Sequence, residues 1–310
     1  MIKFNYRAKD LIECLGGDII SDEDVIIECV STLNSPAINS MMFFTEKKWK
    51  DEYFNLLDKI EKSFIIIEPT LKEKFMAICN NNCIVVSENA RLYFAKALKT
   101  MIGKINKERN YCMQDNYIMG ENVIIGENVS IEPQVFIDHD VVIGNNVIIR
   151  TGVKIRQNVI IEDNVIIGEN SVIGAQGFGI EKDVDGKNLR IPHIGGVVIK
   201  ENVEIGALSS IVSGTIFPTV IERNVFIDDL NHIAHNCHIG EGTLTTGKVE
   251  VGGSAKIGSN SYIAPNATIR NGISIGENCF IGQASSVQKS FGDNVSLVGN
   301  PAKIFDKKNN

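Results

Sequence analysis

The sequence repeats a large apolar residue at every sixth position over much of its length. Between positions 119 and 173, ten consecutive members of this series are Ile or Met. A helical face would repeat every 3.6 residues and a half-buried strand every two, so neither explains a strict period of six. Repeats of fixed length are typical of solenoids, in which each short unit packs against its neighbours. The chain therefore builds much of its length from one small unit.

Each six-residue unit also contains a second apolar position and a turn position. Val stands two residues before the large apolar residue in eight successive units, from Val123 to Val165. Three residues after it stands Asn, Asp, Gly or, once, Gln, and all but Gln readily adopt the left-handed backbone conformation. Each unit is predicted to be a short strand closed by a tight turn. Aromatic residues are only 7% of the chain, as expected if β-branched side chains fill a narrow interior.

The series is interrupted twice. It stops at Ile173, resumes at Ile199, shifts by four residues after Ile211 and then continues to Val287. Residues 174–194 are therefore predicted to form a protruding loop. The pattern resembles the hexapeptide-repeat, left-handed parallel β-helix, in which three units make one triangular coil. The resemblance, and not the spacing, implies the hand; a right-handed β-helix with its less regular repeats is the alternative.

The N-terminal third of the chain lacks the repeat and is predicted to be a separate α/β domain. Local patterns predict helices over 7–16 and 91–105 and strands over 63–67 and 83–87. Residues 106–116 are polar and have the composition of a linker. The fold class expected is mainly β, with a small N-terminal α/β domain. The domains expected are residues 1–110, a β-helix over 111–300 and a short tail over 301–310.

Charge and cysteine content narrow the partners and the compartment. The formal net charge of -7 argues against nucleic acid as the main partner, because Lys and Arg bind phosphate backbones. No signal peptide and no run of 18 apolar residues is present, so a cytoplasmic protein without an integral membrane segment is expected. The seven cysteines are interpreted as small buried hydrophobes. Cys79 and Cys83 lack a second pair of ligands, so no zinc site is expected there.

Three of the five histidines lie within residues 231–238. The repeat alone is compatible with an acyltransferase, a metal-dependent carbonic anhydrase or a structural module, so residues outside the pattern must decide. His232 and His238 are six apart and should lie on successive faces, where they cannot converge on one zinc ion. His235 falls in a turn near a prism edge. A histidine there is suited to remove a proton from an amine that attacks a thioester.

Two further positions complete this candidate catalytic site. Asp228 or Asp229, one unit upstream, is expected to orient the His235 ring and stabilise its cation; the alternative is a plain turn residue. If a coil has eighteen residues, Gly253 stacks beside His235. Its N–H is then placed to donate to the thioester carbonyl oxygen as negative charge develops, whereas the alternative is a glycine needed only for the turn.

Three strings, in their order and spacing, resemble the UDP-3-O-acylglucosamine N-acyltransferase family of lipid A biosynthesis. They are Gly174-Ala175-Gln176-Gly177-Phe178-Gly179, Arg190-Ile191-Pro192-His193-Ile194-Gly195 and Ile233-Ala234-His235-Asn236. The resemblance covers nearly the whole chain. It implies His235 as the base, Asp228 as the upstream aspartate and Gly253 as the oxyanion donor. It also implies homotrimers with active sites in the grooves between prisms, across which the 174–194 loop would reach.

The same resemblance implies a nucleotide site in the front domain. That family holds the base of its nucleotide between two aromatic rings, which fall here on Phe43 and Trp49. Phe178, in the first string, is likewise assigned to the substrate. Stacking on a ring face suits a pyrimidine and is worth about 1–3 kcal/mol per base in single-stranded nucleic acids. The sequence does not distinguish a UDP-linked from a dTDP-linked sugar.

Three features depart from that family. Ile273 stands where the family has a second histidine, and Val212-Ser213-Gly214 replaces an acidic-basic pair before a glycine. The third is the end of the sequence at Asn310, without the helical extension that helps that family dock acyl carrier protein. The string Gly299 to Lys303 instead resembles the exit of the β-helix in sugar acetyltransferases that use coenzyme A. Lys303 is accordingly assigned to the phosphates of an acyl-CoA.

The function expected from the sequence is an N-acyltransferase. It would move an acyl group from acyl-CoA to the amino group of a nucleotide-linked amino sugar, such as a dideoxy sugar, with no metal and no tightly bound cofactor. The first alternative is the lipid A enzyme itself with acyl carrier protein as donor. The second alternative is a non-catalytic β-helix scaffold.

Overall fold

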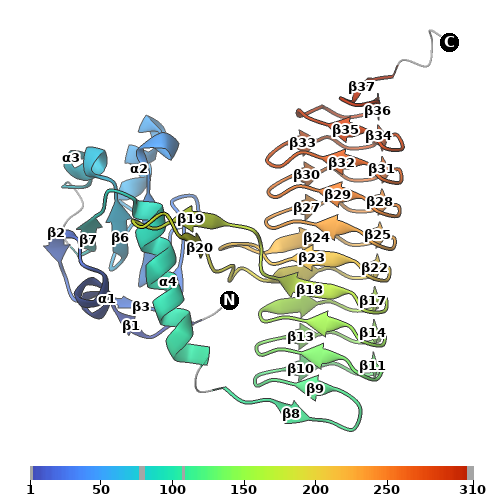
Figure 1. The fold of residues 1–310 in the computed structure, drawn as a ribbon, viewed down its shortest axis with the longest axis horizontal. Coiled ribbons are helices and arrows are strands. Elements are labelled where there is room, and N and C mark those ends of the chain that lie inside the picture. Colours follow the sequence, from blue (N-terminus) through green and yellow to red (C-terminus); the bar gives the residue numbers. More distant parts are fainter. Residues whose placement is uncertain (1–2, 77–80, 107–108, 306–310) are drawn as a thin grey trace. The chain divides into compact units, whose positions relative to one another are not determined.

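The structure, a computed structural model, describes residues 3–76, 81–106 and 109–305. The chain divides into two compact units (Figure 1). The first unit comprises residues 1–108 and 178–192, and the second comprises residues 109–177 and 193–310. The residues around the gap in the repeat thus belong to the first unit, although the repeats on either side of them belong to the second.

The first unit is an α/β domain. Its five-stranded sheet has the order β2-β7-β6-β5-β4, in which β4 to β7 run parallel and β2 pairs antiparallel with β7. The strands of the unit are β1 (Tyr6–Arg7), β2 (Asp18–Asp22), β3 (Ile26–Ile27), β4 (Cys29–Val30), β5 (Ser40–Phe44), β6 (Phe64–Ile67), β7 (Cys83–Val86), β19 (Ile180–Lys182) and β20 (Asn188–Arg190). The helices are α1 (Ala8–Leu15), α2 (Phe54–Leu57), α3 (Lys72–Phe75) and α4 (Ala90–Asn106), with single 3-10 turns at Glu46–Lys48, Asp51–Tyr53 and Pro69–Leu71.

The predicted elements of this domain are confirmed. They correspond to α1, α4, β6 and β7, whose apolar runs fold as expected because every residue of β6 and β7 is buried. The sequence patterns missed β2, β4 and β5. β2 has exposed and half-buried positions but no buried one, and β4 is only two residues long. β5 lies between β6 and the edge strand β4 and is mostly buried.

The second unit is a parallel β-helix with three faces, one for each long sheet (Figure 1). Face A contains β8 (Cys112–Met113), β9 (Ile118–Met119), β12 (Phe136–Ile137), β15 (Lys154–Ile155), β18 (Val172–Ala175), β23 (Ser210–Val212), β26 (His232–Ile233), β29 (Glu250–Val251), β32 (Thr268–Ile269) and β35 (Ser286–Val287). Face B contains β10 (Ile124–Ile125), β13 (Val142–Ile143), β16 (Val159–Ile161), β21 (Val197–Ile199), β24 (Thr219–Ile221), β27 (His238–Ile239), β30 (Lys256–Ile257) and β33 (Ser274–Ile275). Face C contains β11 (Ser130–Ile131), β14 (Ile148–Ile149), β17 (Ile166–Ile167), β22 (Glu204–Ile205), β25 (Phe226–Ile227), β28 (Leu244–Thr245), β31 (Tyr262–Ile263), β34 (Phe280–Ile281), β36 (Ser296–Val298) and β37 (Lys303–Ile304).

A coil of the β-helix has eighteen residues, as the six-residue period predicts. Ile124 pairs with Val142, and Lys256 pairs with Ser274, each at a separation of 18 residues. The separation rises to 38 where Val159 pairs with Val197, because an insertion that includes the β19–β20 hairpin lengthens the coil there. Each coil therefore satisfies the backbone groups of the next through parallel strand pairing.

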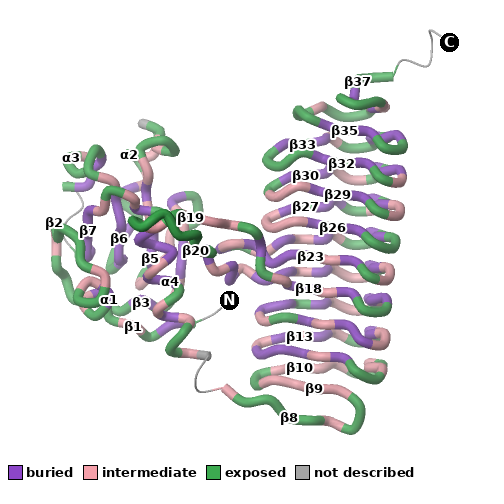
Figure 2. The backbone as a smooth tube through the Cα atoms, in the orientation of Figure 1, coloured by how far each residue is buried: buried purple, intermediate pink, exposed green. Residues whose placement is uncertain are grey.

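The interior of the β-helix consists of the two apolar positions of each unit. From Val135 to Val287 these Ile and Val side chains are at most 8% exposed, and they form one continuous cluster along the prism. Figure 2 shows buried positions recurring along the coils beyond β9, whereas the first coil is half-buried or exposed. Each six-residue unit buries roughly one large and one small apolar side chain. This burial stabilises the core, because the hydrophobic effect grows with the apolar area removed from water.

The turn position adopts the left-handed conformation, as predicted. All nine turn residues from Asn122 to Asn170 have positive φ, between 55° and 74°. On the edge between faces B and C, the asparagine amides also bond to one another from coil to coil. Asn146 Nδ2 donates to Asn164 Oδ1, and Asn164 Nδ2 donates to Asn202 Oδ1, both at 3.2 Å.

Replacing Asn164 by Val is expected to destabilise the protein by about 1–3 kcal/mol, because a β-branched residue is strained at positive φ. The matched variant Asn164→Gly removes the same amide but tolerates φ of 60°, so its loss should stay within about 1 kcal/mol. Urea unfolding measures both. Equal losses in the two variants would show that the amide bonds, and not the backbone conformation, make Asn164 important.

Part of the predicted linker belongs to the β-helix. Within residues 106–116, β8 pairs antiparallel with β9, and the Tyr111 hydroxyl donates to Asp138 Oδ1 at 2.9 Å. Burial and that hydrogen bond raise the pKa of Tyr111. The guanidinium of Arg109 also bonds the carboxylate of Asp140. The polar residues that suggested a linker therefore attach the chain to the first coils.

In the described part of the chain, no helix combines the length and the apolar character that crossing a membrane requires.

Candidate active site

His235 lies in the turn after β26, on the edge where face A meets face B. Ile233, two residues earlier, points into the core and is fully buried. The half-buried ring of His235 lies against the backbone of Gly253, one coil further along. A Cβ atom on Gly253 would stand 2.6 Å from Nε2 of His235, so only glycine leaves room for the imidazole. The predicted stacking of His235 on Gly253 is confirmed.

The amide of Asn236 lies within hydrogen-bond distance of the His235 ring. Its Nδ2 donates to the carbonyl oxygen of Phe217 at 3.0 Å, which identifies Oδ1 as the acceptor atom. Oδ1 accepts from the N–H and the hydroxyl of Thr215, at 3.1 and 2.9 Å, and lies 3.2 Å from Nδ1 of His235. Nδ1 therefore carries the ring proton and donates a hydrogen bond to Oδ1 of Asn236. This leaves Nε2, the nitrogen beside Gly253, as the basic atom of the ring.

Asp228 and Asp229 do not orient His235 within one chain, contrary to the sequence-based expectation. Both follow β25, on the edge between faces C and A, whereas His235 lies on the edge between faces A and B. Asp229 Oδ1 accepts from the N–H of Ala207 at 2.7 Å, and Asp228 is exposed. Asp228 and His235 are seven residues apart, which is about one six-residue unit, so they lie on neighbouring edges of the prism. The amide of Asn236 occupies the place expected for the carboxylate.

The backbone N–H of Gly253 donates no hydrogen bond to any described residue. At the equivalent turn position of other coils, the backbone N–H donates to a side-chain oxygen one coil further along. The N–H of Glu127 donates to Asn145 Oδ1 at 2.8 Å, and the N–H of Asn145 donates to Asp163 Oδ1 at 2.7 Å. An unused N–H close to a basic nitrogen is what an oxyanion donor requires. That role for Gly253 stays a prediction.

Phe43 and Trp49, the rings predicted to hold the nucleotide base, pack against different neighbours. Phe43, on β5, packs against Phe94 of α4 with ring centroids 4.7 Å apart. The next residue, Phe44, points to the other face of the sheet and packs against Trp49 and Phe75, at 6.2 and 4.8 Å. Successive side chains of a strand point to opposite faces, so Phe43 and Phe44 lie on opposite sides of the sheet, and Trp49 packs with Phe44. The assignment of Phe43 and Trp49 to one nucleotide base stays a prediction.

Phe178 and Lys303 are both exposed. Phe178 is 80% exposed at the start of the β19–β20 insertion, and the guanidinium of Arg190 lies 5.6 Å from its ring centroid. Lys303 lies on β37, the last strand of face C. The assignments of Phe178 to the substrate and of Lys303 to coenzyme A phosphates stay predictions.

His193 is a neighbour of His235 to which the sequence assigned no role. Their ring centroids are 5.2 Å apart, with the planes at 63°. His193 is 4% exposed, and its backbone is bonded on both sides by the amide of Gln176. His193 belongs to a string outside the six-residue pattern, whereas His235 lies within the pattern. That departure was the only signal for His193, because its contact with His235 joins residues 42 positions apart in the sequence.

The repeats match a known family. Residues 122–157, 140–175 and 254–287 match the model described as bacterial transferase hexapeptide (six repeats). We call the second unit, which contains these repeats, the hexapeptide domain. A solved structure of a UDP-N-acetylglucosamine acyltransferase from Campylobacter jejuni resembles the chain with a TM-score of 0.57 and 27% identity, over 63% of this chain and 79% of that one. The predicted fold class, a left-handed parallel β-helix with a small N-terminal α/β domain, is confirmed.

Two curated relatives of the chain are named for the same activity. The UDP-3-O-acylglucosamine N-acyltransferase 2 of Sulfurimonas denitrificans is 34% identical over 116 residues, which is 37% of each chain. The UDP-3-O-acylglucosamine N-acyltransferase of Herminiimonas arsenicoxydans is 40% identical over 116 residues, 37% of this chain and 33% of the relative. The predicted resemblance is confirmed, although the match spans little more than a third of the length of these relatives.

The other histidines of the 231–238 stretch lie on different faces of the hexapeptide domain. His232 is on face A, with Nε2 4.0 Å from Glu250, and His238 is on face B, with Nε2 3.1 Å from Glu222. Among the described residues no group of three or more His, Cys, Asp or Glu side chains is arranged to hold a metal ion. Cys79, one of the two cysteines considered for zinc, lies outside the described residues.

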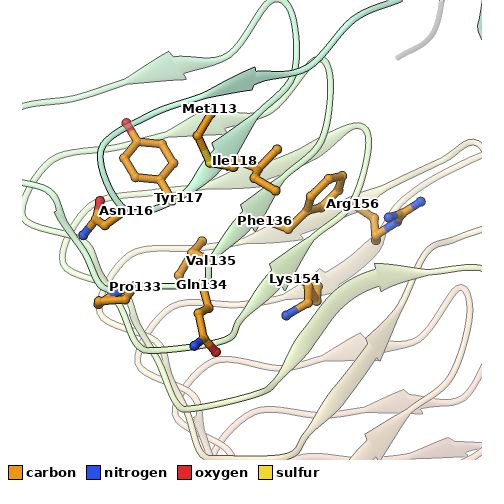
Figure 3. Close-up of a pocket in the computed structure, with 10 residues that line it drawn as sticks. All are labelled: Met113, Asn116, Tyr117, Ile118, Pro133, Gln134, Val135, Phe136, Lys154 and Arg156. Carbon is orange, nitrogen blue, oxygen red and sulfur yellow. The ribbon is translucent and has the colours of Figure 1, made fainter.

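A pocket of about 590 Å³ opens on face A of the first coils of the hexapeptide domain. Met113, Ile118 and Phe136 form apolar walls, and Lys154 and Arg156 approach from the neighbouring coil (Figure 3). Arg156 is paired with Asp138 at 3.3 Å. β12, which carries Phe136, stands four positions before β26 in the strand order of face A. This pocket is therefore separate from the turn that holds His235.

Proposed function

We propose that the chain is an N-acyltransferase that acylates the amino group of a UDP-linked amino sugar. The observation that carries this proposal is the pairing of a basic Nε2 on His235 with the unused N–H of Gly253, stacked one coil apart. A base and an oxyanion donor side by side are the two groups that transfer of an acyl group to an amine requires. The names of the curated relatives give the same class of reaction.

The proposed reaction is a direct attack of the sugar amine on an acyl thioester. Nε2 of His235 takes a proton from the amine nitrogen as the C–N bond forms. The carbonyl oxygen becomes an oxyanion and accepts the N–H of Gly253. When the C–S bond breaks, the imidazolium returns the proton to the thiolate, so the products are an amide and a free thiol. Positioned bases contribute about 10²–10⁴ to such a rate, and one oxyanion donor contributes about 10²–10³.

The comparisons favour the alternative substrates over those first expected. The relatives are named for UDP-3-O-acylglucosamine, and none of those named above is described as acting on a dideoxy sugar. We therefore propose a UDP-linked 3-O-acylated glucosamine as acceptor. Acyl carrier protein, the donor that the family resemblance implies, replaces acyl-CoA as the proposed donor.

A homotrimer, which the family resemblance also implies, is proposed as the working assembly. It is supported by a row of apolar side chains on face C that are 38–47% exposed, namely Phe226, Leu244, Tyr262 and Phe280. A contiguous exposed row of this kind is typical of an interface between proteins. Light scattering should give three times the mass of one chain, whereas a monomer would contradict this assembly.

A two-by-two substrate test examines the proposed function. The protein is incubated with a UDP-linked 3-O-acylglucosamine or a dTDP-linked amino dideoxy sugar, each with acyl carrier protein thioester or acyl-CoA. Mass spectrometry should find the amide product when the UDP-linked 3-O-acylglucosamine is incubated with the acyl carrier protein thioester. Product formed only from the dTDP sugar and acyl-CoA would overturn the proposed substrates. A protein inert to all four combinations would support the scaffold alternative.

A further inference from the structure

We propose that His193 is a positioning residue that holds the imidazole of His235 in its reactive orientation. The inference rests on the proposed function, because it assigns His235 as the base. Its starting point is that the ring of His193 is the aromatic neighbour of the His235 ring, at 5.2 Å between centroids.

The backbone of His193 is fixed by a single side chain. Gln176 Oε1 accepts the N–H of His193, and Gln176 Nε2 donates to its carbonyl oxygen, both at 2.9 Å. This reciprocal pair resembles one step of a strand ladder. It attaches the chain that returns from residues 178–192 to the coil that those residues left.

The two imidazoles lie between two glycines. A Cβ atom on Gly177 would stand 2.5 Å from Nε2 of His193, and a Cβ atom on Gly253 would stand 2.6 Å from Nε2 of His235. Each ring therefore rests on bare backbone. The order along the edge is Gly177, His193, His235 and Gly253, so His235 is confined from both sides.

The loop over residues 213–218 connects the supports of both rings. The N–H of Ile194, next to His193, donates to the carbonyl oxygen of Thr215 at 2.9 Å. Thr215 in turn donates through its hydroxyl to Asn236 Oδ1 at 2.9 Å, the atom that faces Nδ1 of His235. The four-residue shift of the repeat after Ile211 therefore produces a structure that holds the two histidines together.

This confinement has a consequence for catalysis. A histidine at a prism edge could otherwise rotate about χ1 and χ2 and turn Nε2 away from the amine. Misplacement of a reacting group by about 1 Å can lower a rate by about 10²-fold. Since His193 acts through His235 and not on substrate, its loss should lower kcat and leave KM nearly unchanged.

Kinetics of two variants test the proposal. His193→Ala removes the ring and should lower kcat by about tenfold or more with KM within about twofold. His193→Phe keeps an aromatic ring without nitrogen atoms and should retain at least about a third of wild-type kcat. If His193→Ala keeps full kcat, His193 does not position the base. If the Phe variant is as slow as the Ala variant, His193 acts through its nitrogen atoms and the positioning role is wrong.

A matched glycine pair controls for general destabilisation. Gly177→Ala would push the His193 ring away and should reproduce the loss of kcat. Gly144→Ala on the edge between faces B and C meets the side chain of Asp163 and the backbone of Glu162, the latter at 2.8 Å, but lies far along the chain from both histidines. It should leave kcat unchanged at temperatures where both variants are folded. Equal losses in the two variants would contradict the proposal.

Nitrogen-15 spectra of histidine-labelled protein separate this proposal from the proposed function. The five histidines give few signals, and His235 should show the Nδ1–H tautomer in the wild type. His193→Ala should convert that signal to an average of tautomers, whether or not any acyl transfer is found. An unchanged signal would overturn the positioning role, while a failure of the substrate test alone would overturn only the proposed function.

Discussion

Replacing His235 by Ala is expected to lower kcat for acyl transfer by about 10³-fold, within the range lost when a positioned base is removed. The physical reason is the hydrogen bond from Nδ1 to Asn236, which leaves Nε2 free to accept the proton of the amine. Binding of the sugar should change little, because the lost interaction develops as the C–N bond forms. Steady-state assays with the UDP-linked sugar and the carrier-protein thioester measure both parameters.

His238 supplies the control for this prediction. It lies three residues after His235 but is exposed on face B, where its Nε2 is 3.1 Å from Glu222. His238→Ala should therefore keep wild-type kcat. Near-normal turnover in His235→Ala would refute the assignment of the base, and an equal loss in both variants would point to a general effect on the fold.

Replacing Ile161 by Ala is expected to destabilise the protein by about 2–5 kcal/mol, the range for a large buried aliphatic residue in a packed core. Ile161 is 1% exposed and stacks between Ile143 and Ile199 of the neighbouring coils on face B. In so narrow a prism, the surrounding side chains have little freedom to fill the cavity. The free energy of unfolding in urea measures the loss.

Ile160 is the matched control, because it is the same residue type on the same strand. It points outward and is 39% exposed. Ile160→Ala removes less buried area and should cost less than about 1 kcal/mol. Equal destabilisation by the two variants would contradict the alternation of inward and outward side chains on which the core depends.

Local patterns predicted the β-helix well because its contacts repeat with the sequence. Outside the two insertions, each coil pairs with the next at a separation of 18 residues, so one period of six determines register, core and turns together. Asn122 and the eight turn residues after it adopt positive φ for the same reason. In the front domain, β5 was missed because its pairing with β6 depends on residues more than twenty positions away.

The candidate site was predicted only in part. His235 and Gly253 lie side by side because they are 18 residues apart, which is one coil, and the six-residue period predicts a coil of that length. Asp228 was assigned to His235 from a short sequence separation, although seven residues lead to another edge of the prism. Phe43 and Trp49 were paired by family resemblance, and in the structure Phe43 packs against Phe94 whereas Trp49 packs against Phe44.

The sequence by itself determined the coil of eighteen residues, the aliphatic interior, the left-handed turns and the stacking of His235 on Gly253. Only the tertiary structure decided which groups surround that ring: Asn236 as the acceptor for Nδ1 and His193 as the neighbouring imidazole. The physical reason is that periodic contacts follow from local spacing. The contacts of His193 and Thr215 instead depend on how two insertions leave the repeat and fold back onto its edge.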